Sequence, residues 1–417
     1  MTAMKVLHFI PSVKAVAGSE AKKYKLALLE TMADYADVHL LATDASGYRL
    51  GRVVVHSYSA MSAAVMRRRR FGGILSMVNP DVVHIHACWN LSAYILLSVC
   101  RKRNISTVLT LDCGLASWRV ACRYWLCKLP MLLAFQRRML AWAGALHAVS
   151  DQEASGLTAF GWHPALRPRN ALNRRIAVVR PFDRVPCMSA KSMTMELLGL
   201  YQKVVDSCPF PQMTSDELKA EDELLRVGMA KGRLACGMEA DVLARLSSLG
   251  DKSWRRIFLH SADEGIYGYV TDGINEAKLP VGILDTSKVE RFVDGAGGHG
   301  YVLGNRMVRK LDRGGGELPD LERGLCLSVL TVLQKMRRLC VRRSDFAELC
   351  VAMRFNDYNE DIVQAELRRL GAARPAARLL QILKERYGLG EGFMFTQPLD
   401  DGKTEVLRRK LFKSNIQ

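Results

Sequence analysis

Residues 79–90, NPDVVHIHACWN, are the stretch that decides the fold. The run 82–85 is mostly apolar and β-branched, as buried parallel strands are, and the Asn-Pro-Asp before it is a turn signal. Polar and aromatic residues follow the run, namely His86, Trp89 and Asn90. Because ligands of open parallel sheets bind at the carboxyl ends of the strands, the loop after this strand is a candidate binding site.

Strand-like and helix-like segments alternate through the first 180 residues. The expected strands are residues 5–10, 38–42, 52–56, 82–85, 107–111, 145–149 and 176–179. Helical patterns between them cover residues 19–32, 91–103 and 118–142. This alternation predicts an α/β fold with a doubly wound, Rossmann-like parallel sheet. Ser150, with Glu153 three positions later, predicts a capping box at the start of the helix after the sixth strand.

The second half of the chain has a less regular pattern. Residues 186–320 read as a divergent α/β or helical region, in which RIFLH at 256–260 is the one convincing strand. Residues 321–417 read as a helical tail, with helix starts at Ser344 and Asp357 and a helix end at Gly388. The expected domains are therefore 1–185, 186–320 and 321–417.

Positive charge is concentrated in the first of these domains. The 417 residues carry a net charge of +18. Residues 1–185 hold 25 Lys and Arg against 10 Asp and Glu, whereas the rest holds 35 against 32. Such a charge favours phosphorylated ligands, an anionic membrane or nucleic acid. The four arginines at 67–70 are either a solvated run or a contact for membrane phosphate.

The eleven cysteines include no CxxC pair, so the sequence predicts neither a zinc ribbon nor a disulfide framework. No apolar window approaches the roughly 20 residues that span a bilayer. We therefore expect a cytoplasmic protein, or one that is peripheral at the inner face of the cytoplasmic membrane. Nucleic acid is not an expected partner, because no helix-turn-helix, RNP-like or zinc pattern accompanies the charge.

Four segments together resemble a known family. They are KVLHFIPSVKAVAGSEAKKYKLALLETM from residue 5, NPDVVHIHACWN from 79, LTLDCGLASWRVACRYWLCKLPMLLAFQRRML from 109, and ALHAVSDQEASGLTAFGW from 145. Residues 4–180 thereby resemble the N-terminal domain of family 4 glycosyltransferases, retaining enzymes of GT-B fold, and in particular the branch that assembles capsule and surface polysaccharide. The resemblance implies transfer of a hexosyl group from a nucleotide sugar to a saccharide or lipid-linked acceptor. It also implies a cleft between two Rossmann-like domains, with no metal or other cofactor.

The resemblance and the residue chemistry point to the same substrate-binding candidates. Gly18 allows close approach of backbone to a ligand, and the amide of Ser19 lies where a helix begins and anionic oxygen is favoured. His86 and Asn90 follow the strand and offer hydrogen bonds to hydroxyl or phosphate groups, while His84 is expected in the core. Two further candidates, Trp89 and Trp118, have side chains able to stack on a sugar, although a buried aromatic is an equal alternative.

Two departures from the family pattern bear on activity. Asp112 occupies the position of the family's histidine beside the reacting sugar, where a carboxylate adds negative charge near a departing pyrophosphate. The family's pair of glutamates separated by seven residues has no counterpart in the second half. His260, Asp263 and Glu264 are candidates for a rebuilt donor site, with a surface helix cap as the alternative. Two readings stay open: an active glycosyltransferase with Asp112 as its catalytic residue, and a degenerate homologue that acts as a partner or scaffold.

Overall fold

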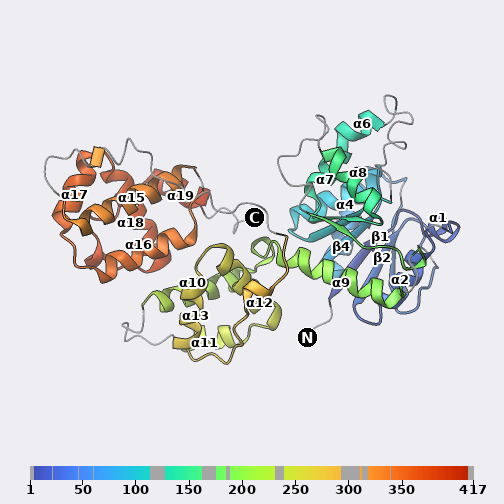
Figure 1. Cartoon of the computed structure of the whole chain (residues 1–417), viewed down its shortest axis with the longest axis horizontal. Helices are drawn as coiled ribbons and strands as arrows, with labels where there is room; N and C mark the ends of the chain where they lie inside the picture. Colours follow the sequence, from blue (N-terminus) through green and yellow to red (C-terminus); the bar gives the residue numbers. More distant parts are fainter. Residues whose placement is uncertain are drawn as a thin grey trace. The chain divides into compact units, whose positions relative to one another are not determined.

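The computed structural model of the chain forms two compact units (Figure 1). Unit 1 consists of Met1–Cys208 and Val289–Gly295, and unit 2 of Pro209–Lys288 and Ala296–Gln417. The structure describes residues 4–20, 22–45, 47–59, 61–112, 126, 128–161, 175–184, 188–230, 239–292, 310–311, 318–338 and 340–411, with side chains 158–161 left out. The expected boundaries at 185 and 320 differ from this division.

Unit 1 is built on one sheet of seven parallel strands. The strands are β1 (Lys5–Phe9), β2 (Asp37–Ala42), β3 (Val54–Ser57), β4 (Val82–His86), β5 (Ser106–Thr110), β6 (Ala145–Ala148) and β7 (Ile176–Val178). Their order, β3-β2-β1-β4-β5-β6-β7, reverses direction between β1 and β4, which is the doubly wound arrangement. All seven strands expected from the sequence are confirmed, and so is the fold class.

Alternation along the strands assigns the two faces of the sheet to different helices. Leu7, Phe9, Val83 and Ile85 share a core with α3 (Ala64–Val78), α4 (Leu91–Lys102) and α7 (Arg137–Trp142). The opposite face, which includes Val6 and Val82, packs against α2 (Tyr24–Met32) and α9 (Ala190–Asp206). Because residues two apart in a strand share a face, His8, His84 and His86 point toward the α2 and α9 side. The sheet therefore turns a row of histidines toward these two helices.

The helix after β6, α8 (Asp151–Gly161), begins much as the capping prediction requires. The Ser150 hydroxyl accepts a hydrogen bond from the Glu153 amide at 3.2 Å. The Glu153 carboxylate reaches back one residue further than expected and accepts from the Val149 amide at 2.8 Å. Both side chains therefore cap the N-terminal turn of α8. The Glu153 carboxylate binds the backbone amide of Val149, where a capping box would use the amide of Ser150.

In unit 2 every element that the structure describes is helical. They include α10 (Ser215–Met229), α11 (Ala240–Ser247), α12 (Asp251–Asp263) and α13 (Tyr267–Glu276). The expected strand at 256–260 is wrong, because these residues lie within α12. Buried Trp254, Ile257, Phe258 and Ser261 have helical spacing, which a five-residue window of apolar residues conceals.

Two glycines allow α10 and α13 to touch along their backbones. A Cβ placed on Gly228 of α10 would lie 1.8 Å from the carbonyl oxygen of Tyr269, and one on Gly273 of α13 would lie 2.1 Å from that of Leu224. No other residue type fits at either position without separating the helices.

The C-terminal half of unit 2 is helical, as the sequence predicts. Its helices are α15 (Asp320–Arg338), α16 (Arg343–Phe355), α17 (Glu360–Arg369), α18 (Ala373–Tyr387) and α19 (Gly402–Leu411). The helix end at Gly388 is confirmed, since this residue caps α18 with a φ of +65°. The helix starts at Ser344 and Asp357 are displaced by two residues, because Arg342 and Asn359 are the N-caps.

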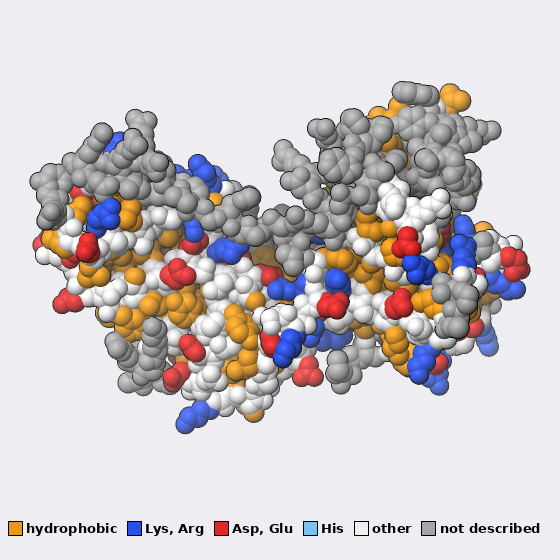
Figure 2. Space-filling model, viewed as in Figure 1, with side chains coloured by type: hydrophobic (Ala, Val, Ile, Leu, Met, Phe, Trp, Pro, Cys, Tyr) orange, Lys and Arg blue, Asp and Glu red, His pale blue; other side chains and the backbone are white. Residues whose placement is uncertain are grey.

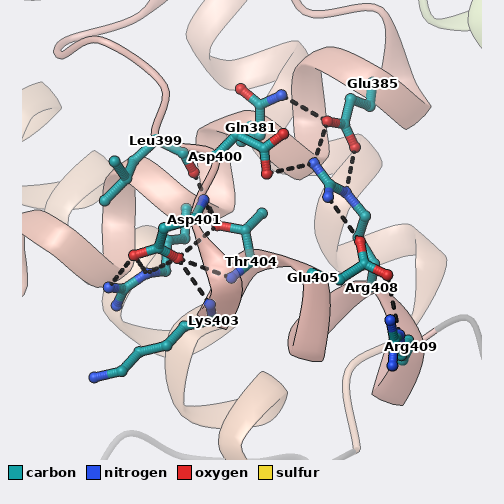
Figure 3. A network of polar contacts seen from close by, with 11 residues as sticks. Gln381, Glu385, Leu399, Asp400, Asp401, Lys403, Thr404, Glu405, Arg408 and Arg409 are labelled. Atoms are coloured by element: carbon teal, nitrogen blue, oxygen red, sulfur yellow. Dashed lines mark hydrogen bonds and ion pairs between the residues drawn. The ribbon is translucent and has the colours of Figure 1, made fainter.

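Ion pairs hold the last helix, α19, against α18. Arg408 of α19 pairs with Glu385 of α18 at 2.5 Å and with Asp400 at 2.8 Å (Figure 3). Arg378 of α18 donates hydrogen bonds to both carboxylate oxygens of Asp401. Asp401 also caps α19, because it accepts a hydrogen bond from the Thr404 amide. These contacts fix the orientation of α19 more than they add to stability, because exposed ion pairs contribute little.

Candidate functional site

Asp112 lies in the turn after β5 and pairs with a lysine of α2. Its backbone lies in the left-handed region, with a φ of +48°, which a non-glycine residue adopts infrequently. One carboxylate oxygen accepts a hydrogen bond from Nζ of Lys25 at 2.6 Å. The Lys25 side chain is 3% exposed and that of Asp112 is 20% exposed. The carboxylate that the sequence places at the catalytic position is therefore neutralised by a buried ammonium.

Lys25 lies on the apolar stripe of α2, together with buried Leu28, Leu29 and Met32. Burial lowers its pKa, and the charge and hydrogen bond of Asp112 oppose that shift. A lysine at an i, i+3, i+4, i+7 position of an apolar stripe is the sequence signal that could have identified it. Sequence reasoning missed Lys25, because the residue that needs it lies 87 positions away.

A cavity of about 300 Å³ opens beside this pair, at the carboxyl ends of β1, β4 and β5. Its described lining consists of Ile10, Pro11, Ser12, Ala15, Val16, Lys22, Lys25, His86, Ala87, Cys88, Trp89, Asn90, Leu111, Asp112 and Lys128. Three lysines and one aspartate give the lining a net positive charge. It is therefore suited to an anionic ligand that also presents an apolar or hydroxylated surface.

The predicted residues Trp89 and Asn90 line this cavity and are held in place by neighbouring helices. Trp89 has a φ of +57°, and its amide donates to Oε1 of Gln136 at 2.9 Å. Lys128 lies 4.7 Å from the centre of the Trp89 ring, a cation–π arrangement. Asn90 is the N-cap of α4, and its side-chain oxygen accepts a hydrogen bond from the Ala93 amide. Part of its hydrogen-bonding capacity is therefore used in capping the helix.

His84 is the buried, satisfied histidine that the sequence predicts. It is fully buried, with Nδ1 2.6 Å from the hydroxyl of Tyr201 and Nε2 2.6 Å from that of Thr110. The Thr110 hydroxyl is in turn 2.7 Å from Nδ1 of His147, whose Nε2 lies 2.9 Å from the carbonyl of Val179. Four polar side chains from β4, β5, β6 and α9 thus form one continuous chain of hydrogen bonds.

The carbonyl at the end of this chain determines the direction of every hydrogen bond in it. A carbonyl only accepts, so His147 donates from Nε2 to Val179 and accepts at Nδ1 from the Thr110 hydroxyl. Thr110 then accepts from Nε2 of His84, and His84 accepts at Nδ1 from Tyr201. Burial keeps both imidazoles neutral, lowering the pKa of His147 to about 4 and that of His84 well below 6.5. Each nitrogen and hydroxyl of the chain therefore has one assigned role.

His86 borders the cavity and is 6% exposed. Its Nε2 lies 3.0 Å from Nδ1 of His8, and the two rings are stacked. Burial lowers the pKa values of both, to about 3 for His8. The predicted ligand-facing residue is thus a neutral imidazole, paired with a second histidine that sequence reasoning missed.

These features occur within a segment that matches a known domain. Residues 21–169 match the model of the glycosyl transferase 4-like domain. The glycosyl transferase 4-like domain thus includes Lys25, Asp112 and the strands from β2 to β6. It contributes most of the cavity lining, and the loop after β1 together with α1 (Val13–Ala17), both outside the matched segment, contributes the rest.

Two further comparisons carry no argument about activity. A crystal structure from Listeria monocytogenes, described as a UDP-N-acetylglucosamine 2-epimerase, aligns with a TM-score of 0.31 and 9% identity, covering 62% of this chain and 72% of that one. No curated protein matches the sequence. The glycosyl transferase 4-like domain match is therefore the one that bears on function.

The three remaining candidates of this region are Gly18, Ser19 and Trp118. Gly18 is the C-cap of α1 (Val13–Ala17), and its φ of −78° is open to any residue. The Ser19 amide donates to the carbonyl of Val16. Neither belongs to the described lining of the cavity. Trp118 lies outside the described residues.

The three donor candidates lie at the end of α12 in unit 2. His260 is bonded through Nδ1 to Glu221 and stacks on Phe210 at 4.8 Å. Glu264 accepts the Arg343 amide at 2.9 Å. Both line a second cavity, of about 190 Å³, and Asp263 is not part of its described lining. The alternative for these residues is a surface helix cap; Glu264 is the C-cap of α12, whereas His260 is buried within the helix.

Proposed function

We propose that the chain transfers a hexosyl group from a nucleotide sugar to a saccharide or lipid-linked acceptor in the biosynthesis of a surface polysaccharide. The observation that carries the proposal is the cationic cavity at the carboxyl edge of the sheet, within the unit that contains the glycosyl transferase 4-like domain. Lys22 and Lys128 supply positive charge for phosphate, and Trp89 supplies a face for a sugar ring.

The Lys25–Asp112 pair removes the main objection to transfer chemistry at this site. A free carboxylate would oppose the departure of a nucleoside diphosphate, whereas a carboxylate 2.6 Å from an ammonium adds little net charge. Asp112 remains able to accept a hydrogen bond from a sugar hydroxyl and orient it. In the retaining reaction that we propose, the donor phosphate assists departure and the acceptor hydroxyl attacks from the same face.

A calorimetric and thermal-shift screen against UDP, GDP and dTDP sugars at low salt tests donor binding. We expect sugar-dependent saturation that Lys22→Ala and Lys128→Ala each weaken by about tenfold, the loss of one charge-assisted contact. Lys191→Ala is the matched control, because Lys191 also lies over an aromatic ring, that of Tyr35 at 5.9 Å, but does not line the cavity. Loss of binding in all three variants alike would contradict the assignment of the cavity.

A second candidate function is a catalytically degenerate homologue that acts as a partner or scaffold. It is favoured by unit 2, where the described residues form helices and contribute no strand to a second parallel sheet. Saturable binding of a nucleotide sugar excludes this candidate. Its absence in folded protein, across the whole panel, overturns the transferase proposal and leaves the partner.

We also propose that unit 1 contacts an anionic membrane, where lipid-linked acceptors lie. No described helix combines the length and apolarity that crossing a bilayer requires. On the face shown in Figure 2, Lys and Arg of unit 1 are interspersed with carboxylates. The first turns of α3 differ, because Val65 (64% exposed) and Met66 (57% exposed) are followed, after the half-buried Arg67, by the exposed Arg68–Arg70. Apolar side chains beside arginines favour the surface of an anionic bilayer.

A further inference from the structure

Three histidines of neighbouring strands meet on the α2 and α9 side of the sheet. His8 of β1 is the cross-strand partner of His84 of β4, and His86 follows two residues later on the same face. Each histidine offers one ring nitrogen, and these three nitrogens all lie within 4.8 Å of one another. The exposed fractions of His8, His84 and His86 are 0%, 0% and 6%. A buried cluster of three imidazoles has the composition of a transition-metal site.

Two members of this cluster carry a nitrogen that the protein leaves unsatisfied. Nε2 of His8 and Nδ1 of His86 are buried and have no hydrogen-bond partner in the described part of the chain. Whichever of the two imidazoles donates across the 3.0 Å contact, one ring N–H and one lone pair remain unmatched. Since buried polar groups in folded proteins are nearly always satisfied, an additional species at the cluster is indicated.

We propose that His8, His84 and His86 bind one Zn²⁺ or a similar divalent transition metal. Zinc–nitrogen bonds of about 2.0 to 2.1 Å in a tetrahedral site require the three nitrogens to draw together, by roughly 1.5 Å for the longest separation. His84 binds the metal through Nδ1, which otherwise accepts a hydrogen bond from Tyr201, and keeps Thr110 as the outer contact that orients a metal-bound imidazole. A fourth coordination position is left to a non-protein ligand.

The charge of Asp112 favours this binding, because it offsets that of Lys25. The Lys25 ammonium disfavours a positive charge at His8, His84 and His86 alike. Asp112, 2.6 Å from that ammonium, offsets it. His147, the next histidine of the row, is neutral, as is Tyr201. Asp112→Asn is therefore expected to weaken metal affinity without touching a ligand.

Metal titration of the full chain, after chelation and dialysis, tests the site. We expect one equivalent of Zn²⁺ to bind by calorimetry and to raise the thermal midpoint. Loss of an outer contact typically costs 10- to 100-fold in affinity, so loss of a ligand in His8→Gln or His86→Gln should cost more than about 100-fold. The matched control is His39→Gln with His56→Gln, because this pair is also stacked with nitrogens 3.0 Å apart but lies outside the cluster.

Co²⁺ substitution gives a readout that needs no variant. The visible ligand-field spectrum should show nitrogen ligation without the intense thiolate charge-transfer band that a cysteine site would produce. Wild-type protein that binds no stoichiometric metal overturns the proposal. Thiolate ligation in the Co²⁺ spectrum also overturns the proposal. Metal binding that persists in the folded His8→Gln and His86→Gln proteins does so too, because either result would identify an adventitious ion. The proposal does not depend on glycosyl transfer, because metal content is measured directly.

Discussion

The ammonium of Lys25 and the carboxylate of Asp112 lie 2.6 Å apart, joining α2 to the turn after β5. The lysine is the more deeply buried partner, at 3% exposure against 20%. Loss of one partner therefore has unequal consequences, because an unpaired charge costs more where water cannot reach it.

We expect Asp112→Asn to lower the free energy of unfolding by about 3 kcal/mol and Lys25→Met to lower it by less. The double variant should be more stable than the sum of the two losses implies, with a coupling of about 1 to 3 kcal/mol. Urea unfolding of all four proteins measures this cycle. Equal losses in the two single variants would contradict the difference in burial.

The hydroxyl of Thr110 joins two imidazoles that have no other partner for the nitrogens it satisfies. Thr110→Val keeps the shape but leaves a donor of His84 and an acceptor of His147 buried and unpaired. We expect a loss of about 2 to 6 kcal/mol in the free energy of unfolding, from about 1 to 3 kcal/mol for each of the two orphaned groups. Thr110→Ser, which keeps the hydroxyl, is the control and should lose about 1 kcal/mol. A loss for Thr110→Val no larger than that for Thr110→Ser would contradict the role of the Thr110 hydroxyl.

The histidine row makes stability depend on pH below 6.5. The pKa values of His8 and His147 are lowered to about 3 and about 4, while in the unfolded chain they return to about 6.5. Between these values only the unfolded state takes up protons, so the free energy of unfolding falls as the pH falls. Each histidine contributes up to about 1.4 kcal/mol per pH unit, with the loss beginning near pH 6.5.

Histidine C2–H resonances measured by NMR separate this effect from the titration of carboxylates. The four histidines on this face of the sheet, His8, His84, His86 and His147, should show no titration near pH 6.5 in the folded protein. A midpoint near 6.5 for any of them would contradict the burial of the row.

The crossing of α10 and α13 predicts opposite outcomes for two glycines of one helix. Gly273→Ala places a methyl group against the backbone of Leu224 and should cost about 3 kcal/mol or more. Gly268→Ala has no atom within 4 Å of the new Cβ and should stabilise α13 by up to about 1 kcal/mol. Thermal unfolding of both variants checks the pair, and a neutral result for Gly273→Ala would show that the helices lie further apart.

Membrane contact through α3 is tested with vesicles of anionic and of zwitterionic phospholipid. Replacing Val65 and Met66 by serine should weaken binding to anionic vesicles by at least about tenfold, from the lost burial of two apolar side chains. Met77→Ser is the control, because Met77 lies at the opposite end of α3 and is 66% exposed. Binding that is unchanged in the Val65 and Met66 variant, or indifferent to lipid charge, would rule out this surface.

The strands of unit 1 could be predicted because each is a short buried segment with turn signals at its ends. The strand predicted at 256–260 was wrong, because its buried residues belong to a helical pattern that begins at Trp254. His86, Trp89, Asn90 and Asp112 were placed correctly at one edge because parallel strands carry their carboxyl ends there. Lys25, His8 and Tyr201 were not foreseen, because their roles depend on which strands and helices become neighbours, and a single sequence does not state the strand order.

The position of β1 at the middle of the sheet has a consequence for synthesis on the ribosome. One of its neighbours, β2, follows within about 30 residues, but the other, β4, begins at Val82. The cover of the histidine row, α9, begins only at Ala190. The emerging chain therefore carries an open strand edge, and then an uncovered row of imidazoles, until that helix leaves the exit tunnel. At roughly 5 to 20 residues per second this lasts on the order of ten seconds or more, an interval in which nascent-chain chaperones would have an exposed sheet to protect.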